Sequence, residues 1–257
     1  MAYLISLIFQ VLLSVPALRA CVVTVVPSFL LLRYVRKKDR LEPEPPKLIW
    51  SLFGLGAASG VLAFVLELAG FSLLALIGPE SGPFALFLHW YVIVGLGEEF
   101  SKYVSLRLYT WRSREFNCLY DGMVYAAAVA AGFALLENIA YLLRYGGSVM
   151  FLRAVVSVPG HVCFGVLMGA WYGAAKKHDI MEARGRSKRC RALAVLVPGL
   201  VHGLFDHLAV SVSSVTGLWP FFLLVGVMFI VCRLMLKRLS DRDAYFTGRE
   251  PDGGESA

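Results

Sequence analysis

Acidic, basic and histidine side chains occur inside long apolar stretches of this sequence, where hydrocarbon would exclude them. Glu98 and Glu99 follow an apolar run at residues 90–97, and Lys102 comes about one helical turn later. A charge in the middle of a bilayer costs on the order of 2.5–3.5 kcal/mol even on the mildest scale, so each one needs a reason. Because two adjacent carboxylates in a medium of low dielectric constant do not both ionise cheaply, they predict a raised pKa or a bound cation.

Three later apolar stretches carry further side chains of this kind. Glu137 and Asn138 are neighbours in one stretch, and His161 opens the next. His202 and Asp206 are four residues apart in a third, so they share one face of a helix. A carboxylate in that position can orient an imidazole, or both groups can bind one metal ion.

These residue types are the ligands and bases of metal-assisted hydrolysis. A catalytic zinc ion takes three protein ligands and keeps one position open for water. We expect the zinc ligands to come from a set of one glutamate, two histidines and one aspartate: Glu99, His161, His202 and Asp206. The same side chains could also activate water without a metal ion, and the sequence does not choose between the two.

The remaining polar residues have roles in the same chemistry. Glu98 or Glu99 could take a proton from water. Asn138 could donate a hydrogen bond to a developing oxyanion. Glu137 would complete the site, and Lys102 would balance its charge.

Structural roles compete with these functional ones. Glu98 and Lys102 are four apart with the acid first, which favours a self-neutralised ion pair and leaves Glu99 without a partner. Glu67 has no polar neighbour in sequence, and we expect a neutral packing role for it. Behind His161, Gly165, Gly169 and Gly173 form a stripe that predicts close helix packing. We expect all five cysteines to be free thiols, because they are scattered and form no CxxC pair.

The composition excludes a soluble enzyme, a disordered chain and a fibre. Hydrophobic residues make up 58% of the 257 residues and charged residues 17%, whereas soluble domains carry about 25% charge. Seven segments are long enough to span a bilayer: 11–34, 48–77, 84–109, 119–143, 154–175, 193–215 and 218–236. We therefore predict an all-α, polytopic transmembrane bundle of seven helices, with eight as the alternative. Residues 1–239 would form one transmembrane domain that carries the hydrolytic site, and 240–257 a flexible cytoplasmic tail.

The basic residues predict the orientation. The net charge is +7, and alternating the loops puts 21 basic residues on one side and only Arg144 and Arg153 on the other. Because cytoplasmic loops retain Lys and Arg, we expect a multi-pass cell-membrane protein with its N-terminus outside and its C-terminus in the cytoplasm. The basic loops would face anionic lipid headgroups, and no nucleic-acid partner is expected. The oligomeric state is not predicted.

In order, these motifs resemble those of the PrsW family of intramembrane metalloproteases. Glu98-Glu99-Phe-Ser-Lys102 resembles EExxK, and Phe133-Ala-Leu-Leu-Glu137-Asn138 resembles FxxxEN. His161 and His202-Gly-Leu-Phe-Asp206 resemble the later histidine motifs. Asp121-Gly122 and Arg40-Leu-Glu-Pro-Glu-Pro45 also resemble family features.

The resemblance implies a membrane metalloprotease related to the CAAX-type prenyl endopeptidases. It further implies first-site cleavage of a membrane-anchored regulator such as an anti-sigma factor. The chain departs from the CAAX pattern because Lys102 replaces an arginine and Glu137 stands where those enzymes have histidine. Prenylated substrates are therefore not expected.

We therefore predict an intramembrane, zinc-dependent endopeptidase that acts at a polar site in the outer half of the bilayer. The alternative from another class is a proton- or ion-coupled transporter that uses the same buried acids. Transporters often show repeated halves and broken helices, and neither is evident in the sequence. Ligation of a haem by His161 and His202 is a third possibility.

Overall fold

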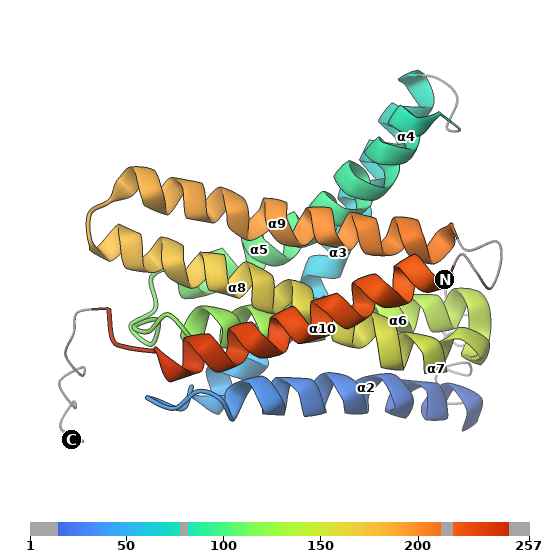
Figure 1. Cartoon of the computed structure of the whole chain (residues 1–257). Helices are drawn as coiled ribbons and strands as arrows, with labels where there is room; N and C mark the ends of the chain where they lie inside the picture. Colours follow the sequence, from blue (N-terminus) through green and yellow to red (C-terminus); the bar gives the residue numbers. More distant parts are fainter. Residues whose placement is uncertain (1–14, 78–81, 212–217, 247–257) are drawn as a thin grey trace, which may run out of the picture.

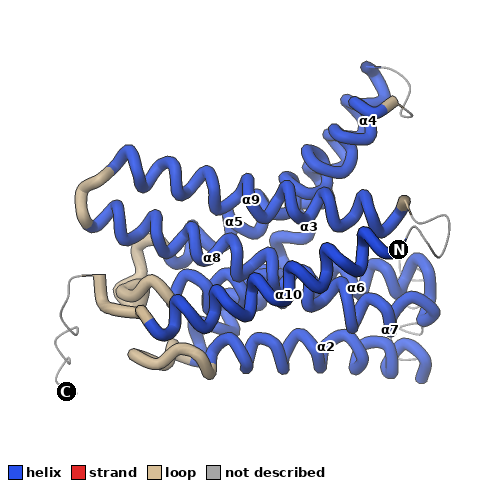
Figure 2. The backbone as a smooth tube through the Cα atoms, viewed as in Figure 1, coloured by secondary structure: helices blue, strands red, loops and turns tan. Residues whose placement is uncertain are grey.

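The computed structural model describes residues 15–77, 82–211 and 218–246 (Figure 1). Within these ranges the regular elements are helices, and strands are absent (Figure 2). The predicted count of seven helical segments is confirmed for this part of the chain. Five segments are long and apolar enough to cross a membrane. The alternative of eight crossings depends in part on residues 1–14, which lie outside the described ranges. The side chain of Cys21 lies outside them too.

Two of the seven segments are composites of α- and π-helical turns. The third contains α4, η1 and α5, and the fifth contains α7, η3 and α8. In chain order the elements are α2 Val15–Arg36, α3 Pro46–Ile77, α4 Pro83–Phe87, η1 Leu88–Leu96, α5 Gly97–Thr110, α6 Asp121–Tyr145, η2 Gly146–Val149, α7 Met150–Leu152, η3 Arg153–Ser157, α8 Val158–Ile180, α9 Arg184–Val210 and α10 Leu218–Asp241.

The helix α9 begins nine residues before the predicted apolar segment. Its first two turns contain the basic cluster of residues 184–191, which we expected to be a loop. Lys and Arg are good helix formers, and this end of α9 lies beside α8 in an antiparallel pair (Figure 1). Charge therefore marks the end of the bilayer here and not the end of the helix.

Helix α6 is the centre of the bundle. It contacts α2, α3, α5 and α8, and residues 121–134 are all buried. This stretch is mostly Ala and Gly, so neighbouring backbones can approach closely. An added Cβ at Gly165 on α8 would lie only 2.8 Å from the carbonyl oxygen of Ala126. The packing role predicted for the glycine stripe is confirmed.

The outer faces of the bundle carry large exposed apolar side chains. On α3 these include Phe64, Leu68 and Leu76, and on α10 they include Leu223 and Ile230. Apolar exposure on this scale is unfavourable in water and suits contact with lipid. The distribution supports a multi-pass membrane protein.

The connections rich in basic residues gather at one end of the bundle, on the left in Figure 1. The Ser240 hydroxyl donates a hydrogen bond to the carbonyl oxygen of Lys38. The backbone N–H of Phe246 donates to the carbonyl oxygen of Asn117 at 2.9 Å. The chain after α10 is therefore held against the loops that follow α2 and precede α6.

Candidate active site

Two π-helical segments lead into the elements that carry the predicted site residues. The first, η1, ends two residues before Glu98. The second, η3, ends four residues before His161. Such wide turns are rare and occur often at functional sites. The apolar periodicity of the sequence gave no sign of either one.

A glycine-lined crossing brings η1 against α9. Gly203 follows His202, and an added Cβ there would lie 2.6 Å from the carbonyl oxygen of Trp90. Gly95 packs in the same way against Gly199. Because these residues have no side chain, the two backbones approach closely enough for the start of α5 to meet the imidazole of α9.

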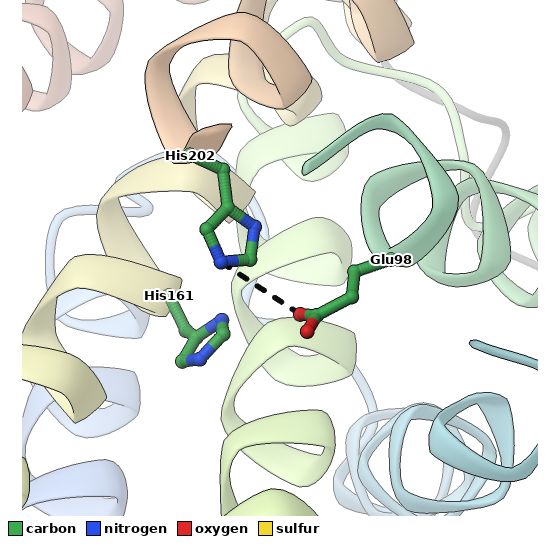
Figure 3. A group of neighbouring side chains, drawn as sticks. All are labelled: Glu98, His161 and His202. Carbon is green, nitrogen blue, oxygen red and sulfur yellow. Dashed lines mark ion pairs between the residues drawn. The ribbon is translucent and has the colours of Figure 1, made fainter. Parts of the chain in front are cut away.

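Glu98, His161 and His202 meet from three different helices (Figure 3). One possible ligand atom from each residue lies within 4.8 Å of the others. All three side chains are buried, with exposures of 6%, 3% and 3%. The carboxylate of Glu98 lies 3.8 Å from Nε2 of His202. The structure therefore brings the acid pair and both predicted histidines into one group.

Lys102 lies in the middle of this group. Its Nζ donates to Oε1 of Glu99 at 2.6 Å and to Oε2 of Glu98 at 3.4 Å. It also contacts Nδ1 of His161 at 3.1 Å. The expected Glu98–Lys102 pair therefore forms, but the shorter contact is with Glu99, which we expected to lack a partner. The charge of Lys102 therefore lies beside both glutamates, and its role in balancing the charge of the site stays a prediction.

These contacts fix the protonation of His161. An ammonium group can only donate, so Nδ1 of His161 accepts and the ring proton lies on Nε2. Nε2 is 2.6 Å from Oε2 of Glu137, which accepts that proton in a hydrogen bond. Glu137 thus orients the imidazole in the way that carboxylates orient histidines at metal sites.

The polar contacts of His202 indicate a positive charge, either on its ring or on an ion bound to it. Its Nδ1 lies 3.0 Å from Oε1 of Glu99, so this nitrogen carries a proton and donates it to the carboxylate. Its Nε2 then faces Oδ2 of Asp206 at 3.3 Å and Oε2 of Glu98 at 3.8 Å. A lone pair facing two carboxylates is repulsive. The arrangement is therefore stable only with a second ring proton or with a metal ion at this nitrogen.

Asn138 and Arg153 form a linked pair beside Glu137. The side-chain amide of Asn138 donates to the carbonyl oxygen of Ala134 at 2.7 Å and accepts from Nε of Arg153 at 2.6 Å. The guanidinium of Arg153 also pairs with Glu137 at 2.8 Å. One of the two side-chain N–H groups of Asn138 is thus used inside the helix, and its role as a donor to an oxyanion stays a prediction. From the sequence we expected Arg153 to be only a loop charge.

A cavity of about 660 Å³ opens onto these groups. Its walls are mainly apolar and come from α3, η1, α6, α9 and the segment from α7 to α8. Glu67 also lines it, beyond the hydrogen-bonded group. The polar residues on its wall are Glu67, Glu98, Glu137, Arg153, Ser157, His161 and Asp206.

The side chains fit a bound metal ion. Two imidazoles and a carboxylate are the ligand types of a catalytic zinc site. The four carboxylates in the polar group carry four negative charges, and Lys102 and Arg153 supply two positive ones. The balance of two negative charges is what one divalent cation or two protons would neutralise.

Comparisons with known proteins point to one family. A family model described as "PrsW family intramembrane metalloprotease" matches residues 44–235. The protein named Protease PrsW from Oceanobacillus iheyensis is 34% identical over 84% of this chain and 94% of its own length. The protein of that name from Bacillus subtilis is 30% identical over 80% of this chain and 88% of its own length. No solved structure matches.

Proposed function

Because the chain belongs to the PrsW family of intramembrane metalloproteases, we propose that it cleaves a membrane-anchored regulatory protein at the site around Glu98, His161 and His202. The family and its named relatives are proteases, so the chain is a peptide hydrolase of the membrane. This membership favours hydrolysis over ion-coupled transport. The observation that carries the site assignment is the meeting of two imidazoles and a carboxylate within 4.8 Å.

In this proposal, Glu98, His161 and His202 would hold a zinc ion, and Lys102 would have to leave Nδ1 of His161, whose lone pair it now occupies. When bound, zinc makes a nucleophilic water available at neutral pH and polarises the scissile carbonyl. Glu99 accepts the Nδ1 proton of His202 at 3.0 Å, and Glu137 accepts the Nε2 proton of His161 at 2.6 Å. Each carboxylate therefore orients one imidazole. This proposal makes Glu99 a positioning residue, because Glu98 and not Glu99 forms the three-residue group with the two histidines, while Oε1 of Glu99 lies beside Lys102 and His202.

Proton transfer then falls to a carboxylate on the cavity wall. Asp206 lines the cavity and lies 3.3 Å from Nε2 of His202, so it can take a proton from water beside that nitrogen. Arg153 also lines the cavity, and Glu137 and Asn138 hold its guanidinium. It is placed to stabilise the negative charge of the tetrahedral intermediate. Asn138 acts through Arg153, and Lys102 neutralises the buried glutamates.

The substrate and the orientation are also part of the proposal. The apolar cavity walls suit a transmembrane segment, and we propose a single-span regulator of the anti-sigma type. The basic loops support a C-terminus in the cytoplasm. Glu137, His161 and Asp206 then lie in the outer half of the bilayer.

The test compares the wild-type chain with Glu98→Gln, His202→Ala and a control, Asp179→Asn, which changes an exposed acid at the end of α8. Mass spectrometry of membranes that contain each variant would detect new N-termini of single-span proteins. We expect these products with the wild type and the control, and their loss with both site variants. Cleavage that persists in both site variants would refute the assignment.

Metal content is measured on the same preparations. We expect about one zinc ion per wild-type chain and none in a His161→Ala, His202→Ala double variant. An active wild-type protein that contains no metal would refute the zinc proposal. It would leave Lys102 as the cation of the site, since its Nζ already lies 3.1 Å from Nδ1 of His161.

A further inference from the structure

A second group of carboxylates lies at the opposite end of α6 from Glu137. Asp39 and Glu44 belong to the connection between α2 and α3, and Asp121 is the first residue of α6. One carboxylate oxygen from each lies within 4.8 Å of the others. Along α6, Asp121 and Glu137 are 16 residues apart, which corresponds to about 24 Å. The group is therefore distinct from the proposed active site.

Buried oxygens in this group have no hydrogen-bond partner. Glu44 is only 5% exposed, and its Oε2 is unpartnered. Both carboxylate oxygens of Asp39 are also buried and unpartnered. One turn after Asp121, the hydroxyl of the fully buried Tyr125 faces Glu44. Buried oxygens without partners are costly, and several that converge point to an absent positive ligand.

Nearby basic side chains do not neutralise these carboxylates. Among the described residues, no Lys or Arg forms an ion pair with Asp39, Glu44 or Asp121. The guanidinium of Arg36 donates instead to the backbone carbonyl of Glu44 at 3.2 Å. Arg40 pairs with Asp241 at the surface. The carboxylates therefore face one another without a countercharge in contact.

The backbone holds the group in place. Oδ2 of Asp121 accepts hydrogen bonds from the N–H groups of Asn117 at 2.9 Å and Cys118 at 2.6 Å. The chain after α10 adds a fourth acid, because Oδ1 of Asp243 accepts the N–H of Tyr120 at 3.1 Å. Oδ2 of Asp243 is buried and unpartnered. The carboxylates are thus positioned before any ligand binds.

We propose that Asp39, Glu44 and Asp121, with Asp243 beside them, form a binding site for one hard divalent cation, Mg²⁺ or Ca²⁺. The site offers only oxygen donors, which these two ions prefer and which contrast with the imidazoles of the zinc site. The cation would tie together three separate segments: the connection after α2, the start of α6 and the chain after α10. It would thus anchor the C-terminal segment to the helix that carries Glu137.

The test measures the thermal unfolding midpoint of the purified full chain in detergent. Buffer freed of divalent ions is titrated with MgCl2 or CaCl2 at a constant zinc concentration, so that the first site stays unchanged. We expect at least one ion to raise the midpoint by on the order of 5 °C at saturation. The variant Glu44→Gln should lose this shift, whereas the exposed-acid control Asp179→Asn should keep it.

Comparing the stability of Glu44→Gln and of the wild type, with and without divalent ions, separates cation binding from a packing role of Glu44. Without divalent ions this variant should be as stable as the wild type or more so, because it removes a buried carboxyl group that has no countercharge. With the ions present the wild type should be the more stable protein. A wild-type midpoint that neither ion moves, or an equal shift in Glu44→Gln, would overturn the proposal.

A second measurement covers the case in which Glu44→Gln does not accumulate. Tb³⁺ occupies oxygen-only cation sites and emits when a nearby tyrosine is excited, and Tyr125 lies beside this site. We expect Tyr-sensitised Tb³⁺ emission from the wild type that excess Ca²⁺ or Mg²⁺ abolishes. The emission should persist in His202→Ala and fall at least tenfold in Asp39→Asn. Equal emission from the wild type and Asp39→Asn would reject the site.

Discussion

Replacing Lys102 by methionine should strongly destabilise the folded bundle. The side chain is 1% exposed, and its Nζ lies 2.6 Å from Glu99 and 3.4 Å from Glu98. Removing one partner of a buried ion pair costs about 3–5 kcal/mol, because the other charge stays buried without compensation. Lys237→Met, an exposed lysine on α10, is the matched control and should change the free energy of unfolding by less than about 0.5 kcal/mol.

The two distances also predict which glutamate is coupled more strongly to the lysine. With an effective dielectric constant of about 20, the Coulomb energies at the two separations are about 6.4 and 4.9 kcal/mol. The Lys102–Glu99 pair is therefore favoured over Lys102–Glu98 by about 1.5 kcal/mol. The lower exposure of Glu99 acts in the same direction.

Double-mutant cycles measure these couplings. Lys102→Met is combined with Glu99→Gln and, separately, with Glu98→Gln. The free energy of unfolding comes from titration of detergent micelles with a denaturing surfactant, followed by tryptophan fluorescence. We expect the Glu99 double variant to be more stable than the sum of its single changes by about 2–3 kcal/mol, and the Glu98 double variant by less. Additive effects in the Glu99 cycle, or a larger coupling in the Glu98 cycle, would refute this account of the charge balance.

Three further predictions test other parts of the structure. Gly203→Val should reduce both stability and cleavage, because a side chain there would meet the backbone of Trp90. The melting temperature and the yield of cleaved product measure the two effects. Unchanged values of both would contradict the close crossing of η1 and α9. Arg153→Gln should lower kcat at least tenfold with a smaller change in KM, as expected for oxyanion stabilisation; a change in KM alone would contradict that role. Burial, aided by neighbouring acids, raises the pKa of Asp39 to about 7 and that of Glu44 to about 9. The folded chain therefore holds protons that the unfolded chain has released. Without divalent ions, the melting temperature should thus fall as the pH rises from about 4 to about 9, and this slope should be smaller in an Asp39→Asn, Glu44→Gln double variant.

The sequence predicted the helical segments and the residues of the polar group, because both depend on one strong signal. A bilayer needs long apolar helices, and any ionisable side chain inside one stands out. Glu98, His161 and His202 were recognisable for that reason. Their meeting could be expected, since isolated buried charges would be costly.

Which carboxylate takes which role could not be read from spacing. Glu98 and Glu99 are neighbours, and only the rotation of α5 after the π-helical turns of η1 decides which one faces Nδ1 of His202 and which one faces Nε2. Arg153 was missed because a basic residue at the end of a span looks like a topology signal. Its contact with Asn138 depends on how η3 folds back toward α6.

The second carboxylate group could not be predicted because its members are far apart in the sequence. Asp39, Glu44 and Asp121 stand in polar connections, where acids are ordinary. Only the packing of these connections against the start of α6 buries them.

The size of the cavity limits how much of a substrate the enzyme can contact at one time. A membrane-spanning helix is about 30 Å long and about 11 Å across, which is far more than a cavity of 660 Å³ encloses. Only a short part of a substrate can therefore lie at the site at one time. Selection would instead depend on how easily a few residues leave their helix, since a peptide carbonyl inside an intact helix is already hydrogen-bonded. Glycine or proline near the cut bond would then matter more than any particular side chain.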